Sequence, residues 1–261
     1  MPMQRKTRGG TRGSRIVPAL LFAGCILAMA IGILVWRYAG PGVGLPLYRS
    51  FGIHLPRNYA IFGIDVSRHQ SVIDWDAVAR MREKDVRIGF AFMKATEGVS
   101  LDDPRFQRNW RNAARTGMPR GAYHYFLPDR DAAAQAGHFI ARVRLQKGDL
   151  PPVLDVEERG GMPTDKIRKR VRQWLDIVER HYGVRPVIYT NVQFYEQVLG
   201  STFDDYPLWV AHYLRHERPR IRRHWSFWQF SERARISGIR GYVDFNAFQG
   251  DSAAFRRLLI R

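Results

Sequence analysis

The chain has 261 residues, 45% of them hydrophobic and 13% aromatic, enough to bury the core of one large domain or two small ones. Cys25 is the only cysteine, which excludes an intrachain disulfide and a cysteine-based zinc cluster. The formal net charge of +18 favours an anionic partner, such as a nucleic acid, an anionic lipid surface or an acidic cell-wall polymer, without choosing among them.

The N-terminal region is basic. No acidic residue precedes Asp65, and eight of the 42 Lys and Arg residues lie in residues 1–58. Residues 59–261 therefore hold 34 basic and 24 acidic residues, a net charge of +10. We expect residues 1–15, which are polar and basic, to form a disordered cytoplasmic tail.

A transmembrane signal-anchor is predicted for residues 16–37. Ile16–Trp36 are 21 positions without a charge, and about 20 apolar residues span a bilayer core. The basic tail should stay in the cytoplasm, which places the rest of the chain outside it, and we expect the periplasm. A cleavable signal peptide, ending near Ala28-Met29-Ala30, is the alternative, but the apolar run continues beyond that point.

Residues 38–58 are predicted to form a linker. They contain Gly40-Pro41-Gly42-Val43-Gly44 and two further prolines, and such residues favour irregular backbone. We therefore expect the folded domain to occupy residues 59–261, held away from the membrane by this segment.

Eight apolar runs of strand length follow. They alternate with helix-like segments in the first part of the domain, and this alternation predicts an α/β fold with buried parallel strands. The runs are Ile61–Val66, Val86–Met93, Gly121–Phe126, Pro152–Val156, Pro186–Tyr189, Leu208–Ala211, Trp225–Phe230 and Tyr242–Phe245. The count favours a small β/α barrel over the alternative, a doubly wound open sheet.

Five helices are predicted between the earlier strands. Asp74 is placed to cap the first, which should reach about Lys84, and Asp103 followed by Pro104 to cap the second, which should reach about Thr116. Helical spacing of apolar residues marks 132–145 and 164–182, the latter stopped by Gly183. A short helix is expected at 193–199. The last three strands leave little room for helices between them.

The stretch Pro151–Glu158 contains a possible catalytic pair. Asp155 and Glu157 are two positions apart, so an extended strand points both side chains to one face. Two adjacent carboxylates repel each other, which should raise at least one pKa. Such a pair can supply the protonated acid and the ionised carboxylate that glycoside cleavage requires. Taken alone, the same pattern also fits an exposed strand end.

The positions of other polar residues favour the catalytic interpretation. In β/α barrels, the chemistry lies at the carboxyl ends of the strands. Acids, aromatics and amides follow most of the predicted strands at that end: Asp65, Lys94, Glu97, Tyr123, His124, Asp155, Glu157, Tyr189, Asn191, His212, Tyr213, Trp228, Gln229, Asp244 and Asn246. Carboxylates supply acid and base groups, and flat aromatic rings suit the faces of sugars.

Residues 60–250 resemble a glycoside hydrolase family 25 lysozyme, an N-acetylmuramidase. Each matching piece is weak alone, but together they cover the folded domain in order. They are Gly63-Ile64-Asp65-Val66-Ser67 with Gln70 and Ile73-Asp74-Trp75, Phe92-Met93-Lys94-Ala95-Thr96-Glu97-Gly98, Gly121-Ala122-Tyr123-His124, Asp155-Val156-Glu157, Trp209-Val210-Ala211-His212-Tyr213, Trp228-Gln229-Phe230 and Val243-Asp244-Phe245-Asn246.

The resemblance implies a modified (β/α) barrel with eight strands and about five helices. It also implies hydrolysis of the β-1,4 bond between N-acetylmuramic acid and N-acetylglucosamine in peptidoglycan, with retention of anomeric configuration and without a cofactor. The family's catalytic acid maps to Glu157, and its other acidic site residues map to Asp65, Asp155 and Asp244. The substrate's 2-acetamido group is the nucleophile that this family pattern suggests.

We predict further substrate-binding residues at the strand ends. Tyr123, Tyr189 and Trp228 are candidate sugar platforms, and Gln229 and Asn191 are candidate polar contacts. Lys94 and Glu97 are expected to form a structural ion pair at the rim. No metal is expected, because His124 and His212 lack zinc-ligand spacing.

Other functions remain open on the sequence. A membrane-tethered glycan-binding scaffold without turnover would use the same residues, although all four acids are present. A hydrolase of another N-acetylated polymer such as chitin would also use an Asp-x-Glu pair. Nucleic-acid binding would follow from the charge, but no motif for it is present. We expect a monomeric domain acting on peptidoglycan glycan strands.

Overall fold

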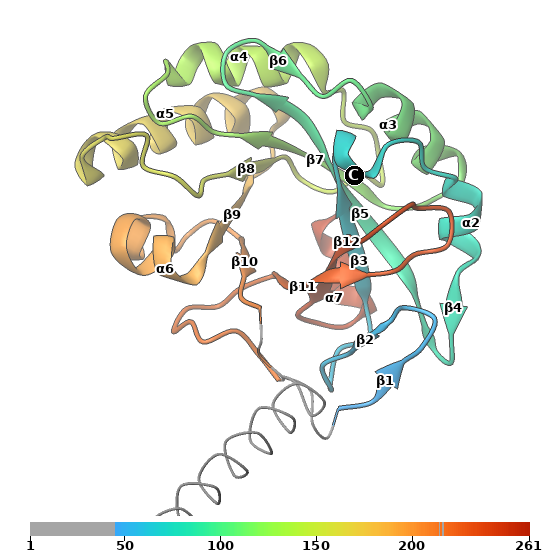
Figure 1. The fold of residues 1–261 in the computed structure, drawn as a ribbon. Helices are drawn as coiled ribbons and strands as arrows, with labels where there is room; N and C mark the ends of the chain where they lie inside the picture. The colour runs from blue at the N-terminus through green and yellow to red at the C-terminus, as the bar shows by residue number, and fades with distance from the viewer. Residues whose placement is uncertain (1–44, 214, 216) are drawn as a thin grey trace, which may run out of the picture. The chain divides into compact units, whose positions relative to one another are not determined.

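The computed structural model describes residues 45–213, 215 and 217–261. In this part of the chain, eight strands close into a barrel with helices on its outside (Figure 1). The predicted tail, the predicted membrane segment and residues 38–44 of the predicted linker lie outside the described residues. Within the described ranges, no helix has the length and hydrophobicity needed to cross a membrane.

Each predicted apolar run coincides with one barrel strand. Buried residues dominate all eight, as expected for strands with helices on one side and a packed barrel interior on the other. The strands are β3 (Phe62–Val66), β5 (Val86–Glu97), β7 (Arg120–Tyr125), β8 (Val153–Asp155), β9 (Val187–Asn191), β10 (Leu208–Ala211), β11 (Phe227–Ala234) and β12 (Val243–Phe248). From β3 through β5, β7, β8, β9, β10 and β11, neighbouring strands are parallel.

The last strand departs from the expected parallel arrangement. β12 is antiparallel to both of its neighbours, β11 and β3, and closes the barrel between them. Residues 235–242 join β11 to β12 without a helix, and a parallel pair would need a longer crossover. In the resulting register Asp244 lies opposite Asp65, so the start of β12 meets the end of β3.

Among the described residues, six α-helices accompany the strands, one more than expected. They are α2 (Trp75–Arg80), α3 (Phe106–Arg115), α4 (Ala132–Arg142), α5 (Thr164–Tyr182), α6 (Val192–Phe194) and α7 (Ser252–Leu258). α5 has the predicted bounds, and Gly183 ends it in a left-handed conformation. The predicted helix at 193–199 is divided into α6 and a π-helical turn, Tyr195–Leu199.

Two helix boundaries differ from the prediction. The Asp74 side chain accepts hydrogen bonds from the Asp76 and Ala77 amides as expected, but α2 ends at Arg80, before the short strand β4 (Arg82–Glu83). Asp103 does not cap α3, which begins only at Phe106. Its carboxylate instead accepts hydrogen bonds from the Arg68 and Arg105 amides, and it thereby ties the segment after β3 to the segment after β5.

Residues 45–58 are packed against the barrel, so the predicted linker is wrong for this stretch. They form the hairpin of β1 (Leu47–Tyr48) and β2 (Ile53–His54). Phe51 is fully buried, with its ring centroid 5.4 Å from that of Phe245, and Leu55 is 2% exposed. Burial of these apolar side chains stabilises the fold, and the folded domain therefore includes residues 45–58.

Aromatic side chains fill the interior of the barrel. Phe90, Phe92, Trp209 and Phe227 pack together there, and the rings of Phe92 and Trp209 stack with centroids 4.4 Å apart. A side chain at Gly63 would meet the Phe90 ring at 2.5 Å, so this close approach requires glycine. The packed rings form the floor of the polar region above them.

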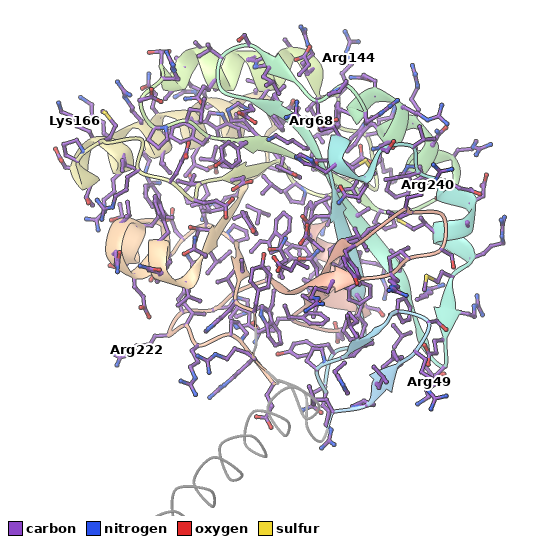
Figure 2. The ribbon with its side chains drawn as sticks, in the orientation of Figure 1. Arg49, Arg68, Arg144, Lys166, Arg222 and Arg240 are labelled. Carbon is purple, nitrogen blue, oxygen red and sulfur yellow. The ribbon has the colours of Figure 1, made fainter. Side chains whose placement is uncertain are left out.

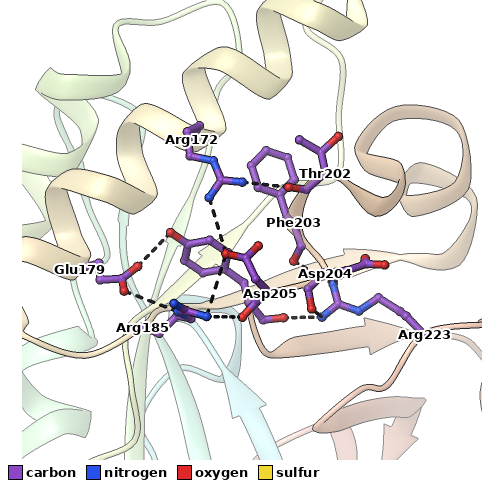
Figure 3. A network of polar contacts seen from close by, with 9 residues as sticks. Arg172, Glu179, Arg185, Thr202, Phe203, Asp204, Asp205 and Arg223 are labelled. Carbon is purple, nitrogen blue, oxygen red and sulfur yellow. Dashed lines mark hydrogen bonds and ion pairs between the residues drawn. The ribbon is translucent and has the colours of Figure 1, made fainter.

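A polar network joins α5 to the segment that leads into β10 (Figure 3). The Tyr206 hydroxyl donates to Glu179 at 2.9 Å, and Arg172 donates to the Thr202 carbonyl at 2.8 Å. Arg185 contacts Glu179 and the Asp205 carbonyl, while Arg223 donates to the Phe203 carbonyl. These contacts hold the connection between β9 and β10 in place without contributing to the polar cavity described below.

Basic side chains project from the domain in several directions. Figure 2 shows Arg49, Arg144, Lys166 and Arg222 at well-separated places on its outline. All four are exposed. The positive charge of the described residues is therefore spread over the surface, and these four do not form a single stripe.

Candidate active site

A polar cavity of about 260 Å³ lies at the end of the barrel where the parallel strands have their carboxyl ends. All four predicted acids line it. The lining residues are Asp65, Ser67, His69, Lys94, Tyr123, Tyr125, Asp155, Glu157, Tyr189, Trp209, Tyr213, Gln229 and Asp244. In the part of the chain that the structure describes, no group of three or more His, Cys, Asp or Glu side chains is arranged to hold a metal ion.

Asp65 is the most firmly held of the acids. It lies near the end of β3 and is 6% exposed, and its Oδ2 accepts hydrogen bonds from Gln229 and Asn246, each at 2.8 Å. Burial raises the pKa of this carboxyl to about 6, and the two amide donors limit the rise because they favour the charged form. The donors come from β11 and β12, so the last two strands orient the acid of the first.

Asp155 is buried at the end of β8 with an unused acceptor. Its backbone carbonyl is bonded to the Phe126 amide, but its Oδ1 has no hydrogen-bond partner among the described residues. Burial and the nearby Glu157 raise its pKa well above the usual range, and Lys94 opposes this. An unsatisfied buried oxygen is costly, and in a cavity it marks a place for a donor from a ligand.

Glu157 is the more accessible member of the pair. It lies just beyond β8 and is only partly buried. Burial and then the charge of Asp65 raise its pKa. The two carboxyls therefore compete for ionisation, and in the pH range between their two pKa values we expect one proton to be shared between them.

Asp244 completes the set from the antiparallel strand. The prediction placed it at the end of the eighth strand, whereas it is the second residue of β12 and reaches the same rim because that strand is reversed. Burial, Asp65 and Glu232 raise its pKa to about 8.

Lys94 acts on the acids as well as on its predicted partner. The ion pair with Glu97 is present, with Nζ 2.6 Å from Oε2, and Nζ lies 4.7 Å from the centroid of the Tyr125 ring. Lys94 also lines the cavity, and its charge lowers the pKa values of Asp155 and Glu157. The prediction of a purely structural role missed this contribution.

Three of the predicted binding residues line the cavity. Tyr123 and Tyr189 lie on its wall, and burial raises the pKa of both phenols well above the usual value, so they are neutral hydroxyls. The Gln229 carbonyl accepts hydrogen bonds from Tyr189 at 2.8 Å and from Tyr213 at 2.6 Å. Gln229 therefore links the tyrosines to Asp65.

Trp228 and Asn191 do not line the cavity. Trp228 is fully buried on the opposite face of β11, against Tyr59, Trp225 and Phe230, because neighbouring strand residues face opposite ways. The Asn191 side chain accepts a hydrogen bond from the Phe194 amide and caps α6. The indole that does line the cavity is Trp209, whose Nε1 donates to Asn246 at 2.8 Å.

The two histidines considered for zinc are engaged elsewhere. His124 is completely buried between Thr96 and Gln135, and burial lowers its pKa to about 3, which keeps it neutral. His212 accepts a hydrogen bond from the Arg220 amide.

Ser67 and His69 were not predicted as site residues. They reach the cavity through the short 3₁₀ turn Arg68–Gln70, which the Ser67 and Gln70 side chains cap at its N-terminal end.

Comparisons with known proteins agree on one family. The model of glycosyl hydrolases family 25 matches residues 64–239. The uncharacterized protein YegX of Escherichia coli K12 is 50% identical over 202 residues, 77% of this chain and 74% of that protein. Lysozyme M1 of Streptomyces globisporus is 35% identical over 206 residues, which are 73% of this chain and 68% of that protein. The solved structure of a family 25 glycosyl hydrolase from Bacillus anthracis superposes with a TM-score of 0.73 at 31% identity, covering 82% of this chain and all of that one.

Proposed function

The chain belongs to glycosyl hydrolases family 25, and on this basis we propose that it is a muramidase, which hydrolyses the β-1,4 bond between N-acetylmuramic acid and N-acetylglucosamine in peptidoglycan. The observation that carries the assignment to this site is the pairing of Glu157 with the unpartnered Asp155 Oδ1 in one cavity. An N-acetylated sugar has an amide N–H that can fill this vacant acceptor position. The remaining roles follow from the positions of the other acids.

Glu157 is the proton donor in this proposal. It is the most accessible member of the Asp155–Glu157 pair, and burial raises its pKa as a general acid requires. When the substrate's acetamido N–H reaches Asp155 Oδ1, the hydrogen bond favours the ionised form of Asp155. The proton that the pair shares then resides on Glu157, so substrate binding itself prepares the acid.

The first chemical step breaks the glycosidic bond. The acetamido carbonyl oxygen attacks the anomeric carbon while Glu157 protonates the departing glycosidic oxygen, and Asp155 stabilises the positive charge that develops on the acetamido group. In the second step Glu157 takes a proton from water, whose oxygen attacks the anomeric carbon and displaces the acetamido oxygen. Two displacements restore the original anomeric configuration, so the product retains it.

Asp65 and Asp244 orient the sugar and tune the acids. Asp65 raises the pKa of Glu157 and of Asp244 through its charge. Tyr123 and Tyr189 present aromatic surface on the cavity wall, and Trp209 closes its floor. This arrangement holds a flat sugar ring between hydroxyls and carboxylates.

Mass spectrometry of fragments released from purified peptidoglycan tests the proposal. New reducing ends are expected on N-acetylmuramic acid, and reducing ends on N-acetylglucosamine would refute the bond assignment. Glu157→Gln is expected to lower turnover by at least about 10²-fold, because it removes the general acid, with the fold intact. Near-normal turnover by this variant would refute the role of Glu157.

We further propose that the enzyme is anchored in a membrane with its catalytic domain in the periplasm. This rests on the sequence of residues 1–37, where a basic segment precedes 21 uncharged residues. Alkaline carbonate extraction of membranes from cells that produce the full chain tests the proposal. Retention in the pellet is expected, and complete release would contradict it.

A further inference from the structure

An exposed aromatic ring lies close to two arginines beside the catalytic cavity. Tyr242 is 50% exposed, and the guanidinium carbons of Arg233 and Arg235 lie 5.8 and 5.7 Å from its ring centroid. Neither guanidinium forms an ion pair with a carboxylate in the described part of the chain. We call Arg233, Arg235 and Tyr242 the arginine–tyrosine patch.

The patch concentrates positive charge. Arg233 lies in β11 and Arg235 directly follows the end of that strand, and both guanidinium groups lie close to the same ring. Hydrogen bonding and charge from Arg235, and then from Arg233, lower the pKa of the Tyr242 phenol. Two like charges held together repel each other, and an anion bound between them would relieve this repulsion.

The patch adjoins the catalytic acids through β12 and through the turn after β3. Tyr242 is two residues before Asp244, a distance of about 7 Å along an extended chain. Its carbonyl accepts a hydrogen bond from Gln70, whose neighbours Ser67 and His69 line the cavity. Ala234, between the two arginines, pairs with Val243 in the sheet. The patch therefore lies next to the part of the rim that carries Asp244.

We propose that the arginine–tyrosine patch is a subsite for the carboxylates of the peptide attached to the lactyl group of N-acetylmuramic acid. Where a stem peptide is attached, the lactyl carboxyl of N-acetylmuramic acid forms a neutral amide, so the peptide supplies the anionic groups of this part of the polymer. Guanidinium groups bind carboxylates through paired hydrogen bonds, and the Tyr242 ring offers an apolar face for the peptide backbone. This inference rests on the muramidase activity proposed above and extends it to the peptide portion of the substrate.

The test compares two substrates and two charge-matched variants. Purified peptidoglycan is compared with the same glycan stripped of stem peptides by an amidase, whose newly exposed lactyl carboxylates are then converted to neutral amides. Both substrates are hydrolysed by the wild-type chain, by R233A/R235A and by R111A/K169A. Arg111 on α3 and Lys169 on α5 are exposed cations on outer helices, so R111A/K169A removes the same charge away from the cavity. Reducing ends released per minute give kcat/KM for each pair.

The wild-type chain and R111A/K169A are expected to prefer the peptide-bearing polymer. R233A/R235A should lose between about threefold and tenfold in kcat/KM on that polymer, the range that two exposed ion pairs supply, and nothing on the stripped glycan. The loss should appear mainly in KM, because the patch touches the peptide and not the reacting atoms.

Three results would overturn the inference. They are an equal loss on both substrates, no loss on either, and an equal loss in R111A/K169A. Failure of the wild-type chain to cleave either substrate would instead refute the muramidase assignment itself. The aliphatic part of the Arg235 side chain packs against the backbone at Gly52, so R235A could disturb the fold. In that case R233A alone serves as a second variant. R233A should show a smaller loss confined to the peptide-bearing polymer, and equal kinetics on both substrates would refute the subsite.

Discussion

Asp65 destabilises the folded domain at neutral pH, and its replacement by asparagine is expected to stabilise it. The Asp65 Oδ2 accepts hydrogen bonds from Gln229 and Asn246. An asparagine side chain keeps one carbonyl oxygen for these donors and removes the buried charge. The substitution therefore isolates the electrostatic contribution of the carboxyl from its hydrogen bonds.

The magnitude follows from the pKa of the carboxyl. Burial raises it from 3.8 to about 6 in the folded state. A difference of about 2.2 at 1.36 kcal/mol per pKa unit corresponds to about 3 kcal/mol. Because the folded pKa is the higher one, the wild-type chain has its full stability below pH ~4 and loses this amount as pH rises through ~6.

Urea unfolding of wild type and Asp65→Asn at a series of pH values measures the effect. The two should have similar free energies of unfolding below pH ~4, and the variant should be about 3 kcal/mol more stable above pH ~7. Asp251→Asn is a control for which the opposite change in stability is expected. The Asp251 carboxylate accepts a hydrogen bond from the Ala254 amide, which lowers its pKa, so that variant should be the less stable one at neutral pH.

A difference between wild type and Asp65→Asn that does not change with pH would refute the reasoning. So would a variant that is less stable than wild type at pH 8. Either result would mean that Asp65 is already paired with a charge that offsets its burial. The variant is expected to gain stability and lose turnover together, as is common when strained polar groups serve function.

Two further substitutions test other contacts. Asp155→Asn keeps an acceptor for the substrate's acetamido N–H but loses the negative charge, so kcat should fall by about 10²- to 10³-fold with little change in KM. Initial rates on purified peptidoglycan measure both constants. A change confined to KM would contradict the role assigned to Asp155. In the wild-type chain, Arg120 Nε lies 2.7 Å from Oδ1 of the buried Asp149. Arg120→Ala leaves the Asp149 carboxylate buried without this ion pair and should lower the free energy of unfolding, measured in urea, by about 3–5 kcal/mol. A loss below about 1 kcal/mol would show that the pair contributes no more than a surface contact.

The sequence was sufficient to predict the barrel strands because their signal is local. Each strand is an apolar run, and burial on both faces leaves little else that such a run can form. The direction of β12 has no such signal, since Val243–Phe248 would read the same way in a parallel strand. Only the short connection after β11 indicates a reversal.

The acids that line the cavity stand out in the sequence more clearly than its aromatic residues do. Carboxylates at strand ends are costly unless they are used, so Asp65, Asp155 and Glu157 stand out in the sequence. Aromatic rings serve cores and sites equally well. Trp228 and Gln229 are neighbours on one strand, so only one of them could face the cavity, and this alternation could have identified Gln229. The capping role of Asn191 was also readable, because asparagine is favoured just before a helix.

The placement of β12 has a consequence for when the enzyme becomes active. Asp65 receives a hydrogen bond from Asn246, 181 residues later in the chain, and Asp244 comes from the same final strand. Contacts between such distant segments form only after most of the chain is available. During synthesis, the Asp155–Glu157 pair emerges well before the strand that completes its surroundings. A partly emerged or C-terminally truncated domain thus lacks both Asp244 and the hydrogen bond from Asn246 to Asp65. Full activity is therefore expected only after β12 has closed the barrel.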